Sequence, residues 1–153
     1  MPASRLLQHL RQVRKLQFSA RSEMATGWAG QGSGTVRVES PPLADAVVFH
    51  ESGRWQPAGR EAAADLAFRN VYRWSLVDAR TVRLEHLRFG PARPVFLLDL
   101  SLAADGVWHA PQPHLCADDT YALRLTVVPD GAHAAWAVRG PRKDETLAYA
   151  YAF

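Results

Sequence analysis

Three short stretches of this chain combine residue types that take part in binding or catalysis. The first is His114-Leu115-Cys116, followed by Asp119 and Tyr121. In an extended strand His114 and Cys116 project to the same face, with their Cα atoms about 6.5–7 Å apart. A histidine beside a thiolate can bind a metal or form a nucleophile–base pair, with Asp119 to orient it. Zinc sites need three or four ligands, so a buried polar cluster or a ligand-lining patch is the favoured interpretation.

The second stretch runs from Trp136 to Asp144 and contains Gly140-Pro141. Gly-Pro is ordinary turn chemistry, so the stretch predicts a strand, a tight turn and the start of the closing strand. Lys143 can pair with Asp144 or present positive charge at the rim of the fold.

The third stretch is Phe68 to Trp74, in which aromatic and basic residues alternate. On a strand, Tyr72 and Trp74 share one face with Phe68, while Arg69 and Arg73 share the other. If the aromatic face fills the interior, the two arginines lie outside. The reverse arrangement places two guanidinium groups in an enclosed lumen, where they would bind an anion. The sequence leaves open which face points inward.

The elements that must position these residues follow from hydrophobic periodicity. A helix is predicted over residues 4–15, with Ser4 as its N-cap and with Leu6, Leu10 and Val13 on one face. From residue 16 onward the apolar residues alternate with a period of two, which is typical of strands. We expect strands at residues 35–38, 46–50, 66–76, 82–89, 95–100, 107–110, 121–127, 134–139 and 146–153. The longest loop is expected over residues 51–65.

Turn residues recur about every dozen positions, which is the rhythm of a meander. About eight to ten short antiparallel strands with one leading helix predict an all-β, up-and-down barrel, because closure removes exposed sheet edges. A β-sandwich is the alternative that periodicity does not separate from a barrel. The 153 residues suit one domain, with the helix over about 4–15 and the barrel over about 16–153.

Composition narrows the function classes. The single cysteine excludes an internal disulfide, and the N-terminal stretch lacks the continuous apolar run of a signal peptide. No stretch approaches the roughly 18 apolar residues of a membrane helix, so we expect a cytoplasmic protein. No phosphate-binding, dinucleotide-binding, zinc-protease or nucleophile-elbow motif is present. We therefore expect a binding protein rather than an enzyme.

The first part of the chain is basic. Five cationic residues precede the first acidic residue, Glu23, and these are Arg5, Arg11, Arg14, Lys15 and Arg21. Such a start can contact nucleic acid, an anionic membrane or a partner, and the plainer interpretation is a solvated helix face. The formal net charge is only +3, and no RNA-binding motif accompanies it, so nucleic acid is not the expected partner.

Taken in order, the three stretches resemble an uncharacterised bacterial family known as the domain-of-unknown-function 6314 family. The matching residues are Arg69, Tyr72, Trp74, His114, Cys116, Asp119, Tyr121, Trp136, Gly140, Pro141, Lys143 and Asp144. The resemblance spans nearly the whole chain and implies a lipocalin-like (calycin) barrel without an assigned activity. The chain departs from the expected pattern at Phe96-Leu97, where a Phe-His pair is expected, and at Asp118, where a proline is expected. The missing histidine argues against a metal or haem centre that would need it.

These observations predict a protein that holds a small molecule, with an anionic one included, inside the barrel. The alternatives are an enzyme built on His114, Cys116 and Asp119, and a partner-binding domain or homodimer that uses the basic helix. No metal and no catalytic residue is assigned, and no cofactor is indicated. The predicted ligand-binding residues are Arg69, Tyr72, Trp74, His114, Cys116, Asp119, Tyr121, Trp136, Lys143 and Asp144.

Overall fold

The computed structural model describes residues 1–24, 29–41, 45–59 and 65–153. Within these ranges the chain forms one helix and an eleven-stranded antiparallel sheet. The elements are α1 (Ala3–Leu10), β1 (Lys15–Ser22), β2 (Gly30–Glu39), β3 (Ala46–Pro57), β4 (Leu66–Asp78), β5 (Thr81–His86), β6 (Val95–Leu102), β7 (Trp108–His109), β8 (His114–Cys116), β9 (Asp119–Val128), β10 (Gly131–Gly140) and β11 (Lys143–Ala152).

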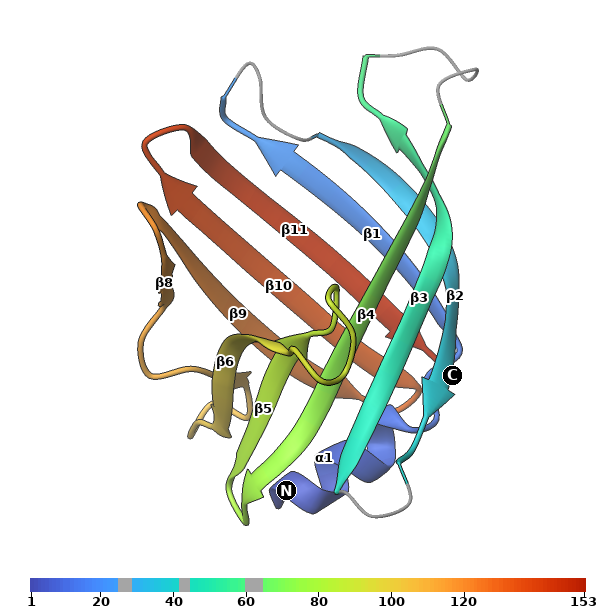
Figure 1. Cartoon of the computed structure of the whole chain (residues 1–153), viewed down its shortest axis with the longest axis vertical. Helices are drawn as coiled ribbons and strands as arrows, with labels where there is room; N and C mark the ends of the chain where they lie inside the picture. The colour runs from blue at the N-terminus through green and yellow to red at the C-terminus, as the bar shows by residue number, and fades with distance from the viewer. Residues whose placement is uncertain (25–28, 42–44, 60–64) are drawn as a thin grey trace.

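The sheet closes on itself, which makes the fold an up-and-down barrel rather than a sandwich (Figure 1). Each strand pairs with its neighbour in the sequence except that β7 does not pair with β8; β1 pairs with β11, and β9 pairs with both β7 and β10. Short β8 adds to the beginning of β9 through the pair Cys116 and Asp119. The predicted all-β, up-and-down antiparallel barrel is confirmed, its shape is compatible with the lipocalin-like prediction, and the β-sandwich alternative is excluded.

Alternate residues of each strand point into the barrel and form its core. On β1 these are Leu16, Phe18 and Ala20, whereas Gln17 and Ser19 point outward. Residues paired with these inward residues on the neighbouring strand also point inward, as Tyr151 does opposite Leu16 and Tyr149 opposite Phe18. The first strand was not delimited by the sequence prediction because only Leu16, Phe18 and Ala20 make up its apolar face and Ala20 is small.

Helix α1 covers one end of the barrel, as its apolar face predicts (Figure 1). Ala3, Leu6, Leu7 and Leu10 are buried in the core. The predicted extent and cap were wrong: the helix ends at Leu10, Pro2 occupies the N-cap position, and no side chain caps it. The next residues turn tightly through the bonds Gln12 N to His9 O and Val13 N to Leu10 O, because the chain must enter β1.

The predicted loop over residues 51–65 was also wrong in its first half, because β3 continues through Pro57. Gly53 marks a close approach of two strands rather than a loop: a Cβ there would lie 2.6 Å from the Cα of Gly34. Residues 60–64 of that predicted loop lie outside the described residues. The predicted strand over 82–89 ends earlier, at His86, where the chain leaves the sheet toward Gly90.

The barrel wall is incomplete beside the N-terminal parts of β4 and β6. Strand β5 pairs with β4 only from Tyr72 onward, and β6 joins β7 only through Ser101 and Leu102. Across this gap the ring of Phe96 contacts the ring of His114 at 5.4 Å between centroids. A side-chain contact therefore bridges the wall where no ladder joins β6 to β8, and the candidate site lies behind it.

Candidate functional site

A cavity of about 320 Å³ lies in the half of the lumen away from α1. Its lining comes from β4, β5, β6, β8, β9, β10 and β11 and from the segment that follows β5. Inward positions of β11 contribute most regularly, with Lys143, Glu145, Leu147 and Tyr149 along one side. A cavity of this size inside a barrel is typical of a site for one small molecule.

Aromatic side chains form much of the cavity wall. Tyr72, Trp136 and Tyr149 lie at its inner end, and Phe96 lies at the gap between β6 and β8. Burial raises the pKa of Tyr72 well above its ordinary value, and burial likewise raises the pKa of Tyr149. Both phenols are therefore protonated at neutral pH and can donate hydrogen bonds.

His86 presents a defined hydrogen-bond donor to this cavity. Its Nδ1 accepts a bond of 3.0 Å from the backbone N–H of Arg88, so the proton of the neutral ring lies on Nε2. Burial and then the nearby Arg88 charge lower the pKa of His86 below its ordinary value, which favours this neutral form. The ring packs edge-on against Tyr72 at 4.8 Å. These contacts hold His86 in one orientation.

Arg88 is a cation of the cavity that forms no ion pair within the described part of the chain. Its guanidinium lies over the ring of Phe89, at 5.1 Å from the centroid. Arg93 lies over the same ring from 5.8 Å, but only Arg88 lines the cavity. An arginine without a carboxylate partner at the edge of an apolar cavity is suited to an anionic group of a ligand.

Lys143 is paired at the rim. Its Nζ lies 3.3 Å from Oδ2 of Asp119, the first residue of β9. The hydrogen bond to Asp119 raises the pKa of Lys143, and Tyr121 contributes in the same direction. Glu145 follows two residues along the same face of β11 and also lines the cavity. Because Asp119 already pairs with Lys143, this ammonium is less suited to a ligand anion than Arg88.

The predicted catalytic alternative is not assembled in this geometry. His114 contacts the rings of Phe96 and Tyr121, and no hydrogen bond joins it to Cys116 or Asp119 in the described residues. Cys116 is exposed at the mouth of the cavity. The carboxylate of Asp119 is engaged by Lys143 instead of by the histidine.

Glu51, which sequence analysis did not single out, lies buried in the barrel beneath the cavity. Its side chain is only 2% exposed, and Oε1 accepts a hydrogen bond of 2.6 Å from the hydroxyl of Tyr151. Burial raises the pKa of Glu51 to about 7, while Tyr151 and Asn70 partly oppose that change. Oε2 is buried and makes no hydrogen bond to any described residue. The carboxyl is therefore poised between its neutral and charged forms at neutral pH.

Six of the ten predicted ligand-binding residues line the cavity, namely Tyr72, His114, Cys116, Tyr121, Trp136 and Lys143. Asp119 acts on it through Lys143, and Trp74 lies beneath it, buried in the core. Arg69 lies on the outer face, and Asp144 pairs there with Arg139 at 3.0 Å. The aromatic face of β4 thus points inward and the face of Arg69 and Arg73 points outward.

The polar residues of the cavity that the prediction missed are His86, Arg88 and Glu145. His86 and Glu145 occupy inward positions that the strand alternation would have indicated once the register was known. Arg88 lies beyond the end of β5, where alternation gives no information.

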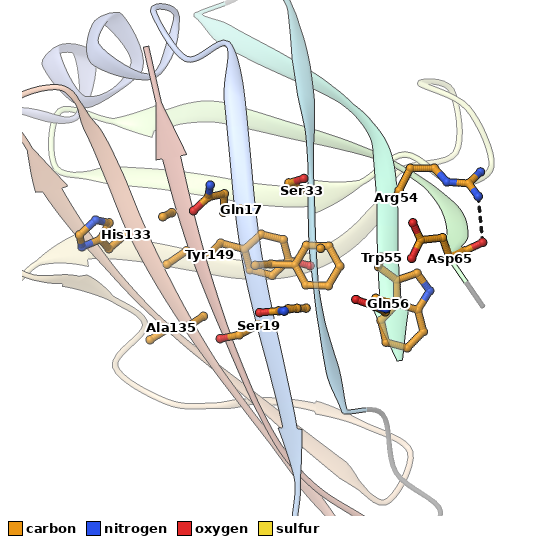
Figure 2. Close-up of a pocket in the computed structure, with 16 residues that line it drawn as sticks. Gln17, Ser19, Ser33, Arg54, Trp55, Gln56, Asp65, His133, Ala135 and Tyr149 are labelled. Atoms are coloured by element: carbon orange, nitrogen blue, oxygen red, sulfur yellow. Dashed lines mark hydrogen bonds between the residues drawn. The ribbon is translucent and has the colours of Figure 1, made fainter. Parts of the chain in front are cut away.

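The outer face of the barrel carries a second, larger concavity of about 730 Å³ (Figure 2). It crosses β10, β11, β1, β2 and β3, where outward residues are small or uncharged, including Ala135, Ser19 and Ser33. Arg54 and Asp65 close one end of it, with a bond of 2.9 Å from the Arg54 guanidinium to the Asp65 carbonyl. The groove lies on the outer face of the sheet and is less enclosed than the lumen cavity, whereas ligand sites usually enclose most of their ligand. We therefore assign the candidate site to the lumen.

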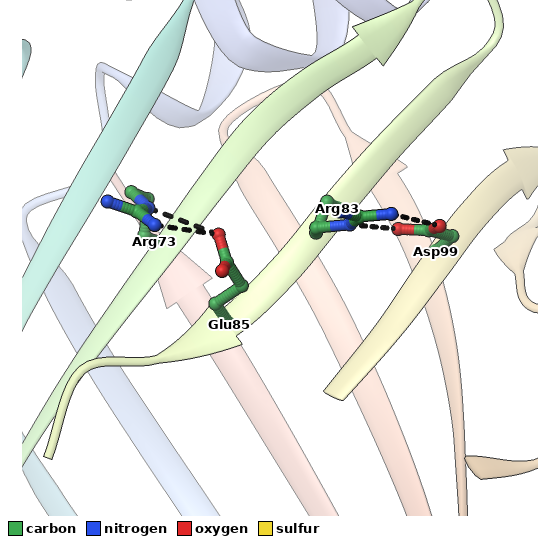
Figure 3. A network of polar contacts seen from close by, with 4 residues as sticks. All are labelled: Arg73, Arg83, Glu85 and Asp99. Atoms are coloured by element: carbon green, nitrogen blue, oxygen red, sulfur yellow. Dashed lines mark hydrogen bonds and ion pairs between the residues drawn. The ribbon is translucent and has the colours of Figure 1, made fainter. Parts of the chain in front are cut away.

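Ion pairs on the outer face fix the strands that carry His86 and Phe96 (Figure 3). Arg73 donates two hydrogen bonds to one oxygen of Glu85 at 3.1 and 3.0 Å, joining β4 to β5. Arg83 binds both oxygens of Asp99 at 2.8 and 2.9 Å, joining β5 to β6. The same Arg83 lies over the ring of Phe96 at 5.2 Å. These contacts brace the short strands beside the gap in the wall.

Among residues 1–24, 29–41, 45–59 and 65–153, no three histidine, cysteine, aspartate or glutamate side chains gather closely enough to hold a metal ion. The only helix in these ranges, α1, is too short to cross a membrane.

Fold and site together define a closed up-and-down β-barrel with a partly polar cavity in its lumen. The chain belongs to a family of unknown function, DUF6314, whose model matches residues 10–152. The match begins at the end of α1 and covers all the strands. No curated protein matches the sequence.

Proposed function

We propose that the protein binds a small molecule in the lumen, and that this molecule combines an aromatic or apolar body with one anionic group. The observation that carries the proposal is the cavity of about 320 Å³, which places aromatic walls next to Arg88. Tyr72, Trp136 and Tyr149 suit a flat apolar body. Arg88 and the Nε2–H of His86 suit the anionic group, because within the described residues the guanidinium forms no ion pair and the Nε2–H has no acceptor.

The size of the cavity limits the ligand. A volume of about 320 Å³ is at the lower end of the range for sites that take metabolites and drug-sized compounds, roughly 300–1,000 Å³. Long acyl chains and dinucleotides are therefore not the expected ligands. A single-ring carboxylate fits this volume and offers both required features.

The proposal is tested by calorimetry with 3-phenylpropionate and its neutral amide, 3-phenylpropanamide, within a wider panel of aromatic carboxylate and amide pairs. We expect saturable binding of carboxylates and weaker binding of the matching amides. A charge-assisted hydrogen bond should make the carboxylate bind about tenfold or more tightly than the amide. The substitution Arg88→Gln should remove most of this preference.

Arg93→Gln is the matched control, because Arg93 lies over the same Phe89 ring but does not line the cavity. It should leave the affinity for 3-phenylpropionate unchanged. Equal losses in both variants, or the absence of saturable binding by every carboxylate of the panel at millimolar concentration, would overturn the proposal.

A further inference from the structure

A small void lies beneath the inner end of the lumen cavity. Its volume is about 10 Å³, close to the minimum that holds one water-sized atom. Tyr72, Trp136 and Tyr149 line both the void and the cavity above it. The void therefore adjoins the cavity at these three side chains.

One buried polar atom with no partner among the described residues belongs to the lining of this void, and a second lies one hydrogen bond away from the lining. Trp74 lines it, is 2% exposed, and has a buried Nε1–H that donates to no described residue. Tyr151 also lines it and connects it to Glu51, whose Oε2 is a buried acceptor without a donor. An unpaired buried donor or acceptor costs about 1–3 kcal/mol, so a group that satisfied them would be bound favourably.

From this geometry we propose that the void is the deep end of the ligand site and receives a hydroxyl group carried by the aromatic end of the ligand. A single oxygen fits the volume. It can accept from Trp74 Nε1–H and donate to the hydroxyl oxygen of Tyr149 or Tyr151, which line the same void, whereas a carbonyl or ether oxygen can only accept. The inference rests on the proposed function and extends it: the ligand class is a hydroxyaryl carboxylate, with the hydroxyl inside and the carboxylate at Arg88.

The aromatic neighbours explain why a ring should carry the hydroxyl. Tyr149 stacks on Tyr151 at 5.8 Å and on Phe18 at 5.4 Å, so the wall beside the void is aromatic. A flat ring that lies between Tyr72 and Trp136 would point its far substituent toward the void that these two side chains share. Aliphatic hydroxy acids would leave the aromatic walls poorly filled.

The test compares two probes that differ by one oxygen: 3-phenylpropionate and 3-(4-hydroxyphenyl)propionate. Calorimetry on the full chain should show that the hydroxylated probe binds at least about tenfold more tightly, which is the ordinary value of a hydrogen bond to a buried orphan group. Trp74→Phe should reduce that preference to within about threefold while leaving the affinity for 3-phenylpropionate nearly unchanged.

Trp108→Phe serves as the matched control. Trp108 is as buried as Trp74, but it lies on β7 and lines neither the void nor the lumen cavity. It should keep the full preference for the hydroxylated probe. If Trp74→Phe does not fold, Tyr149→Phe, which removes only a hydroxyl from the lining of the same void, should produce the loss instead.

The outcomes separate the two proposals. Equal affinity of the wild-type protein for both probes, with binding still dependent on Arg88, would overturn the deep hydroxyl site and leave the proposed function standing. An undiminished preference in folded Trp74→Phe would likewise overturn it. Failure of both probes, together with every carboxylate of the panel, would reject the lumen site itself and with it the hydroxyl site.

Discussion

The hydroxyl of Tyr151 donates a 2.6 Å hydrogen bond to the carboxyl of Glu51 inside the barrel, across a separation of 100 residues in the chain. The bond joins the closing strand β11 to β3, which are not neighbours in the sheet. It places a titratable group at the centre of an otherwise apolar and aromatic core. The strongest pH dependence of the molecule is therefore expected here.

We predict that Glu51→Gln stabilises the protein at alkaline pH. Burial raises the pKa of Glu51 in the folded state to about 7, from an ordinary value of 4.5, so the folded protein holds this proton more tightly than the unfolded chain. The contribution of Glu51 to stability is thus most favourable below pH 4.5, declines as the pH rises, and levels off above about 7. The glutamine variant, which keeps an acceptor for Tyr151, should be about 2–3 kcal/mol more stable than wild type at pH 8.

Urea unfolding of both proteins at pH 4 and pH 8 checks this sign. The two should differ little at pH 4, where Glu51 is neutral in both states. Glu39→Gln is the control, because Glu39 lies on the outer face with its side chain 54% exposed. A glutamine variant at position 51 that is less stable than wild type at pH 8 would show that the ionised carboxylate is stabilising instead.

The helix is expected to be part of the core rather than a detachable arm. Leu6 is fully buried against the barrel, and Leu→Ala in such a place costs about 2–5 kcal/mol. Leu6→Ala should therefore lower the midpoint of thermal unfolding strongly. Arg5→Ala, one residue earlier on the exposed face, should change the free energy of unfolding by less than about 0.5 kcal/mol. Similar effects of both substitutions would contradict a packed helix and favour the alternative of a partner-binding arm.

Periodicity predicted an all-β fold of alternating strands, and the barrel was favoured over the sandwich only because closure removes exposed sheet edges. Lengths were harder to predict, since Gly53 and Pro57 indicate a loop in isolation but belong to β3, where β2 supplies the ladder. The helix end was missed for a related reason. Val13 continues the apolar spacing and is buried, yet it reaches the core from a turn after α1 rather than from another helical turn.

The candidate site was predicted where its residues lie on strands with clear alternation, as Tyr72 and Trp136 do. The inward direction of β4 could not be derived from its own sequence, because Arg73 and Tyr72 alternate equally well in either orientation. Glu51 was overlooked because a lone carboxylate in a polar segment normally indicates exposure. Its burial follows only from the register that places it between Val36 and Asn70.

The two outer ion pairs should differ in strength. Glu85 has a side chain only 11% exposed and pairs with Arg73, whereas Asp99 and Arg83 are 35% and 42% exposed. Glu85→Ala leaves Arg73 half-buried without its acceptor and should cost about 1–3 kcal/mol. Asp99→Ala should cost at most about 1 kcal/mol, because water replaces much of an exposed pair. Urea unfolding measures both, and a larger loss for Asp99→Ala would contradict the role given to burial.

Cys116 offers a direct report on the mouth of the cavity. The thiol is exposed and lines the site, so a maleimide should label the native protein at this position without denaturant. Since a ligand in the lumen would cover the mouth, saturating 3-phenylpropionate should slow the labelling severalfold in wild type and much less in Arg88→Gln. Cys116→Ser should abolish labelling and leave the fold intact, because an exposed side chain contributes little to stability. If labelling requires denaturant, the mouth is closed in solution. If saturating 3-phenylpropionate does not slow labelling, the bound ligand lies elsewhere.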